Sequence, residues 1–151
     1  MSSTAAPTTR QPLVIVDGSN VAYGGGKFRQ PQLSILLRVI EELRRQCLGV
    51  VAIVDASLRH RIDDPNGLES MICDGRIEQS PAYRDADEFI TELALRRVAK
   101  GDQVYVLTND GFPDKARPDG LSRIALMVVT VFGGDELMFN PRLESLARTA
   151  I

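Results

Sequence analysis

The sequence predicts an α/β fold in three layers, with a central, mostly parallel sheet and helices on both of its faces. Two observations predict it. Strand-sized apolar runs alternate along the chain with longer segments in which apolar residues recur every three or four positions. The strand-sized runs are apolar at successive positions, which is typical of parallel strands that are buried on both faces.

The elements follow from these runs in order. Main strands are predicted over residues 13–17, 50–54, 103–107 and 126–132, with a short strand at 76–79. Long amphipathic helices are predicted over 33–47 and 85–100, the second opened by a capping box of Asp85 and Glu88. Shorter helical segments are expected at 57–62 and 68–73 and after Pro141, with a turn at 63–67. Residues 1–12 are expected to be a flexible tail, and residues 13–151 one domain.

Composition excludes several classes of protein. No apolar run approaches the roughly 20 residues of a membrane span, and the first dozen residues lack the apolar centre of a signal peptide, so a cytoplasmic protein is expected. With one histidine, His60, no site that needs two histidines is available. The two cysteines, Cys47 and Cys73, are not spaced as a zinc site, and both are expected to pack as small hydrophobic residues. The net charge of -2 argues mildly against nucleic acid unless bound cations reverse the local sign.

Carboxylates follow the predicted strands at the points where the strands end. Asp17, Asp55 and Asp110 each follow an apolar run, Asp114 comes four residues after Asp110, and Asp87 lies in the first turn of a helix. Ligands of open parallel sheets bind beyond the carboxyl ends of the strands, where these groups converge. Carboxylates that share a site repel one another unless a cation lies between them, and oxygen ligands suit Mg²⁺ or Mn²⁺.

Each of these residues also has a structural interpretation. Asp17-Gly and Asp110-Gly are common turn dipeptides, Asp85 has the spacing of a helix cap, and Asp87 can complement a helix dipole. Their shared position at strand ends favours a joint role. The segment from Gly24 to Lys27 is not a Walker motif, because the lysine is followed by Phe28.

Three segments resemble the NYN branch of the PIN-like nucleases, most closely the regnase-type (CCCH zinc-finger-associated) ribonuclease domain. They are Val14-Ile-Val-Asp-Gly-Ser-Asn-Val21, Asp87-Glu-Phe-Ile90 and Val106-Leu-Thr-Asn-Asp-Gly-Phe-Pro-Asp114, and the resemblance spans residues 13–132. It implies a PIN-like sheet flanked by helices, a Mg²⁺-bound acidic pocket, and endonucleolytic cleavage of single-stranded RNA.

The resemblance also implies roles for individual residues. Asp17, Asp87, Asp110 and Asp114 would hold the metal and, with Asn20, form the catalytic group. We expect substrate contacts from the polar and basic residues nearby, which are Ser19, Lys27, Arg59, Arg61, Thr108, Asn109 and Lys115. The regnase-type pattern has two adjacent aspartates before an Arg-Phe-Ile stretch, whereas this chain has Ala86 in the first place and Glu88 in place of the arginine.

Two alternatives stay open at this point. One is a catalytically weak NYN domain that binds RNA or a protein partner, which Ala86 and the acidic balance favour. The other is a PIN-type toxin that an antitoxin neutralises. A homodimer is compatible with each of them, and a membrane partner with none.

Overall fold

The computed structural model describes residues 11–109, 124–133 and 136–149. Its six strands form one sheet in the order β3-β2-β1-β4-β5-β6. The strands are β1 (Leu13–Asp17), β2 (Gly49–Val54), β3 (Glu78–Gln79), β4 (Val104–Leu107), β5 (Ala125–Phe132) and β6 (Glu136–Asn140). All neighbouring strands are parallel except β5 and β6, which are antiparallel, so the predicted mostly parallel α/β fold is confirmed.

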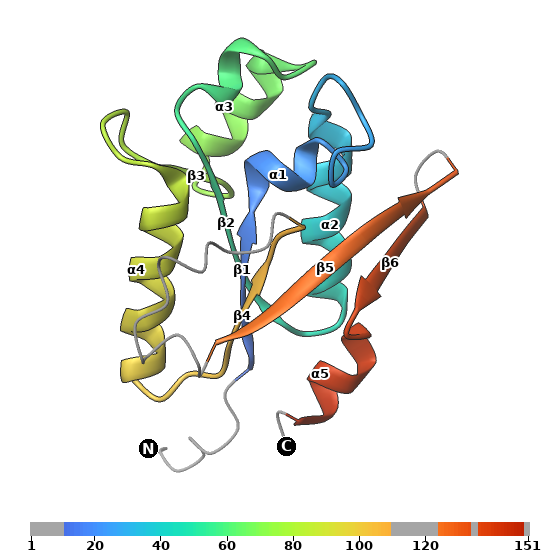
Figure 1. Ribbon diagram of the computed structural model, residues 1–151, viewed down its shortest axis with the longest axis vertical. Helices are drawn as coiled ribbons and strands as arrows, with labels where there is room; N and C mark the ends of the chain where they lie inside the picture. The colour runs from blue at the N-terminus through green and yellow to red at the C-terminus, as the bar shows by residue number, and fades with distance from the viewer. Residues whose placement is uncertain (1–10, 110–123, 134–135, 150–151) are drawn as a thin grey trace.

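The helices lie on both faces of this sheet (Figure 1). They are α1 (Gly18–Ala22), α2 (Leu33–Arg45), α3 (Pro65–Cys73), α4 (Ala86–Ala99) and α5 (Leu143–Thr149), with a 3-10 turn, η1, at Leu58–His60. Helices α2 and α5 pack on one face and helix α4 on the other.

Strand β1 shows why its sequence is apolar at every position. Val14 and Val16 pack among the residues of α2, whereas Ile15 packs among those of α4, and all three are fully buried. Because successive side chains of a strand point to opposite faces, a central strand with two covered faces needs an apolar residue at each step.

Strand β5 differs from the cover on both faces that its apolar run predicts, and so does its unpredicted neighbour β6, as far as the described residues go. Helix α4 contacts β1, β4 and β2, and along β5 every second side chain is exposed. Leu126, Val128 and Phe132 are 36%, 38% and 44% exposed, and Met138 of β6 is 58% exposed. Within the described residues, helices therefore cover one face of this hairpin only.

Three local predictions also need correction. Residues 63–67 are not only a turn, because α3 already begins at Pro65, with the Asp64 carboxylate accepting a hydrogen bond from the Gly67 N–H at 2.9 Å. Strand β6 was missed, since its five residues mix polar and apolar types. Helix α2 ends at Arg45, so Cys47 lies beyond it with a φ of 62°, and both cysteines are exposed rather than packed. Among the described residues, no helix has the length and apolar character needed to cross a membrane.

The packing of Gly18 yields a stability prediction. A Cβ atom at Gly18 would lie 2.7 Å from Val54 Cγ1 and 3.0 Å from the Ile53 carbonyl oxygen. We expect Gly18→Ala to lower the free energy of unfolding by about 1–3 kcal/mol, because the backbone of β2 must shift to admit the methyl group. Gly49→Ala is the matched control, since its nearest neighbour would be 3.5 Å away. Urea denaturation measures both, and equal losses would contradict the packing argument.

Candidate active site

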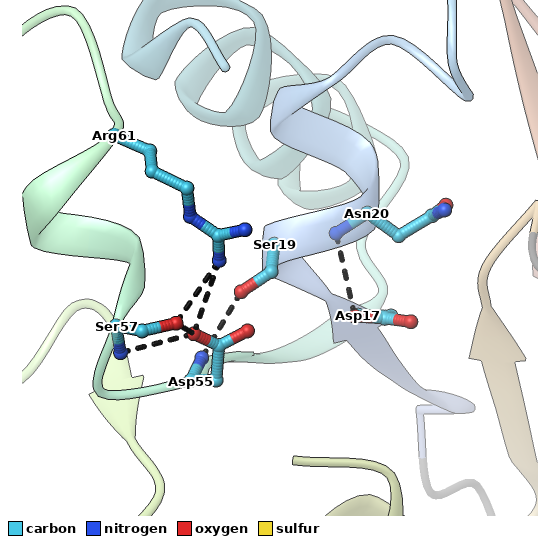
Figure 2. A network of polar contacts seen from close by, with 6 residues as sticks. All are labelled: Asp17, Ser19, Asn20, Asp55, Ser57 and Arg61. Atoms are coloured by element: carbon cyan, nitrogen blue, oxygen red, sulfur yellow. Dashed lines mark hydrogen bonds and ion pairs between the residues drawn. The ribbon is translucent and has the colours of Figure 1, made fainter. Parts of the chain in front are cut away.

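Asp17 lies at the centre of the site. It is the last residue of β1 and its side chain is buried, with 5% exposed. Its Oδ2 accepts a hydrogen bond from Thr108 Oγ1 at 2.9 Å, and its Oδ1 accepts one from the Asn20 N–H at 3.4 Å (Figure 2). Thr108 follows β4, the strand that pairs in parallel with β1. The carboxylate is therefore held from two sides, by Thr108 after the neighbouring strand and by Asn20 in α1.

Asn20 and Asn109 link the ends of β1 and β4 to the middle of β5. The Asn109 N–H donates to Asn20 Oδ1 at 2.9 Å. The Asn109 side chain pairs with both backbone groups of Val129 in β5: its Nδ2 donates to the carbonyl at 2.7 Å, and its Oδ1 accepts from the N–H at 3.0 Å. An amide side chain thus continues the β4–β5 ladder beyond Leu107. Gly25, with a φ of 69°, lies against this side chain and leaves no room there for a Cβ.

A second polar network starts at the end of β2. The Asp55 N–H donates to Ser19 Oγ at 3.0 Å, which ties β2 to the first turn of α1. Asp55 Oδ1 accepts hydrogen bonds from the Ser57 N–H at 3.0 Å and the Ser57 hydroxyl at 2.6 Å. Arg61 reaches back to the same group, with its Nη2 3.0 Å from Ser57 Oγ and 3.7 Å from Asp55 Oδ1 (Figure 2).

A cavity of about 610 Å³ opens beyond these strand ends. One wall comes from β1, α1 and the segment after β2, and the other from the segment before α4 and its first turn. The lining residues are Asp17, Ser19, Asn20, Tyr23, Asp55, Ala56, Ser57, Arg61, Pro81, Ala82, Arg84, Asp85, Ala86 and Asp87. Carboxylates and amide or hydroxyl oxygens dominate, and the described lining contains neither histidine nor cysteine.

The structure brings five of the predicted site residues into this lining. They are Asp17, Ser19, Asn20, Arg61 and Asp87, and Thr108 lies directly behind Asp17. Lys27 instead donates to the Val131 and Gly133 carbonyls at 3.0 and 3.4 Å. Arg59 lies 3.0 Å from Gln79 Oε1 and 3.4 Å from Glu69 Oε1, outside the lining.

The remaining predicted residues, Asp110, Asp114 and Lys115, lie outside the described residues. Of the four predicted metal ligands, the structure describes Asp17 and Asp87, which lie in opposite walls of the cavity. In the part of the chain that the structure describes, no cluster of three or more His, Cys, Asp or Glu side chains is placed to hold a metal.

Sequence reasoning missed several lining residues, among them Tyr23 and Arg84. Arg84 pairs with Glu92 through both terminal nitrogens, at 3.3 and 3.2 Å, and lies over the ring of Phe89 at 5.8 Å. The hydrogen bond to Glu92 raises the pKa of Arg84, and the same bond lowers the pKa of Glu92. Arg84 precedes the helix and is eight residues from its partner, so helical periodicity gave no signal for it.

The comparison of sequences decides the family. Residues 10–143 match the model of the Zc3h12a-like ribonuclease NYN domain. The chain belongs to this family. The resemblance of the three motif segments is thereby confirmed, and the cavity at the end of β1 is the candidate active site of an NYN ribonuclease domain.

Other comparisons add little beyond the family. No curated protein sequence matches the chain. Among solved structures, the crystal structure of Rae1 (YacP) from Bacillus subtilis, as its W164L mutant, is similar to it, with a TM-score of 0.49 and 16% identity. The match covers 93% of this chain and 77% of Rae1.

The first turn of α4 departs from the predicted capping box. Asp85 occupies the N-cap position, but its side chain makes no capping hydrogen bond, with a ψ of 141°. It is exposed and lines the cavity of the NYN domain. Asp85 therefore borders the site, and its side chain makes no hydrogen bond to the helix backbone.

This difference gives a testable prediction. Asp85→Ala should change the free energy of unfolding by no more than about 0.5 kcal/mol, since no cap bond is lost. Asp64→Ala, which removes the cap bond of α3, should cost about 1 kcal/mol. Chemical denaturation of the two variants checks this, and equal costs would restore the helix-cap role of Asp85. A loss of RNA cleavage in a stable Asp85→Ala variant would assign it to the site.

Proposed function

We propose that this chain is an endoribonuclease that hydrolyses single-stranded RNA with the help of carboxylate-bound Mg²⁺ or Mn²⁺. The observation that carries the proposal is the buried Asp17 carboxylate, held by Thr108 and Asn20 at the edge of a cavity that Asp87 lines from the other side. Membership of the NYN ribonuclease family supplies the substrate class.

The donor set of the cavity suits such a metal. Its described lining offers carboxylate, amide and hydroxyl oxygens, which hard divalent cations prefer. Asp17 and Asp87 would hold the ion, together with Asp110 and Asp114, whose roles rest on the motif resemblance. When bound, the ion supplies an activated water and positive charge at the phosphate.

The residues of the chain have distinct tasks in this proposal. Thr108 and Asn20 are neutral donors, so they orient the Asp17 carboxylate without cancelling its charge. The amide oxygen of Asn20 is engaged by the Asn109 N–H, which leaves its NH₂ group to donate to a phosphate oxygen. Ser19 lies between Asp17 and Asp55, and its hydrogen bond to the Asp55 N–H ties the end of β2 to α1 within one wall of the cavity.

A single strand fits this site better than a duplex. Because Asp17 is only 5% exposed, the scissile phosphate must enter the cavity to reach it. A flexible strand can bend its backbone into a recess, whereas a duplex keeps its phosphates on a stiff helical path. We expect no substrate contact from Lys27 or Arg59, because their nitrogens bond to protein groups outside the lining.

The direct test is cleavage of labelled single-stranded RNA with Mg²⁺, Mn²⁺ or EDTA. We expect cleavage with either metal and none with EDTA. Asp17→Asn should lower the rate by at least about 100-fold, and Thr108→Val by about 10–100-fold, because the first removes a ligand and the second only its orientation. Melting curves show that both variants fold, and Mn²⁺ should raise the melting temperature of the wild type more than that of Asp17→Asn.

Two results would contradict the proposed function. One is wild-type cleavage that persists unchanged in EDTA. The other is a folded Asp17→Asn variant that cuts RNA at the wild-type rate.

Ala86 gives a second prediction. Its side chain is buried in the cavity lining, where the regnase-type pattern has a carboxylate. Ala86→Asp should raise the Mg²⁺-supported rate by about tenfold, because it adds a ligand near the ion and suits the amino end of α4. Before this change, Mn²⁺ should support cleavage better than Mg²⁺, since Mg²⁺ demands stricter coordination.

Ala82→Asp is the matched control, because it adds the same charge to the same cavity outside the helix. An equal gain from both variants would show a general effect of charge. No cleavage by the wild type or by Ala86→Asp with any metal would favour the alternative of an NYN domain that binds RNA without cutting it.

A further inference from the structure

The backbone of Tyr23 is held by hydrogen bonds in the same cavity lining as Asp17. It follows α1 directly, and its backbone N–H donates to the Asn20 carbonyl at 3.1 Å. Its own carbonyl accepts from the N–H groups of Gly26 and Phe28 at 3.1 and 3.0 Å. Tyr23 is the one aromatic residue in the described lining of the cavity.

Arg61 lies over this ring, with its guanidinium carbon 5.9 Å from the ring centre. Its Nη2 is fixed by Ser57 Oγ at 3.0 Å and faces Asp55 Oδ1 at 3.7 Å. Both contacts use the same nitrogen, so they hold one edge of the guanidinium. The side chain is still 48% exposed, and it extends toward the end of β1 (Figure 2).

The charge of Arg61 is already partly balanced by Asp55. That balance weakens its attraction for a phosphate, because the nearby carboxylate repels the same anion. The contacts with Asp55 and Ser57 use one edge of the guanidinium and do not involve its flat faces. Bases of single-stranded RNA stack on aromatic rings and on arginine planes, and this contact does not depend on net charge.

We infer that Arg61 and Tyr23 form a subsite on which one nucleobase of the bound RNA stacks, next to the phosphate that enters at Asp17. The inference rests on the proposed function for the identity of the ligand. Asp55 and Ser57 are then positioning residues, since they fix the guanidinium and do not touch the base. The matching arginine on the opposite wall, Arg84, precedes α4 and has both terminal nitrogens on Glu92 of that helix.

The test combines protein variants with abasic RNA. A fluorescein-labelled 12-nucleotide RNA is titrated with the full chain in Ca²⁺, anisotropy reports binding, and a gel shows that the RNA stays intact. A single abasic site is moved along the strand. We expect one position at which the abasic site weakens wild-type binding by about fivefold or more, which is the lower end for loss of a stacked base.

The variants identify the partner of that base. Arg61→Lys keeps the charge and loses the plane, so it should bind intact RNA as weakly as the wild type binds the abasic strand, with no further effect of the abasic site. Tyr23→Leu should behave in the same way, and Tyr23→Phe like the wild type. Arg59→Lys is the matched control, because Arg59 is two residues away and bonds to Gln79 and Glu69 outside the cavity.

The outcomes separate the subsite from the proposed function. If Arg61→Lys remains as sensitive to the abasic site as the wild type, Arg61 is a phosphate contact and the subsite is wrong. A wild type that binds no RNA, or binds it without any sensitive position, overturns the subsite as well. Sensitive binding that Arg61→Lys abolishes, in a chain that cuts no RNA, supports the subsite and refutes the nuclease. If Tyr23→Leu fails to fold, Arg61→Lys alone decides.

Discussion

The parallel pairing of β1 between β2 and β4 is the constraint on which the site depends. Three buried valine and isoleucine residues of β1 are covered on both faces, so the strand cannot slip without exposing them. The same register places Asp17, an acidic residue, at the buried end of β1 and sets Thr108, which follows the adjacent strand β4, beside it. The packing that stabilises the centre of the sheet therefore also keeps the Asp17 carboxylate in a position with little access to water.

Neighbouring residues of one short motif have different roles, one at the candidate site and one in the sheet. In the Thr108-Asn109 segment, the threonine hydroxyl turns to Asp17, whereas the asparagine side chain completes the β5 backbone. Lys27 does similar work farther along β5, where it bonds to the Val131 carbonyl. Backbone groups beyond the end of a shorter neighbouring strand need partners, and side chains from the loops provide them. Membership of a functional motif therefore does not by itself show that a residue contacts the substrate.

The sequence predicted elements where one period dominates, and it failed where tertiary contacts decide. Strand β1 and helix α4 agree with their predicted ranges to within a residue, because each has a single clear pattern of apolar positions. The sequence also predicted which polar residues lie at the strand ends, and Asp17, Asn20 and Asp87 do line one cavity. The capping box at Asp85 did not form, although its spacing was right, because spacing alone does not set the rotamer of the carboxylate. Tyr23 and Arg61 are 38 residues apart by number, and no local pattern could pair them.

The net charge of -2 is compatible with RNA once the charges are placed. Four aspartates and two arginines line the described cavity, and each arginine has an acidic partner of its own: Asp55 for Arg61 and Glu92 for Arg84. The arginines are therefore held at fixed places on the walls by these acidic partners. In the proposed function, a divalent ion bound to the carboxylates would reverse the sign of the local field and so favour a polyanion. The proposed function therefore couples RNA binding to metal binding, because an acidic cavity would admit its substrate together with its metal.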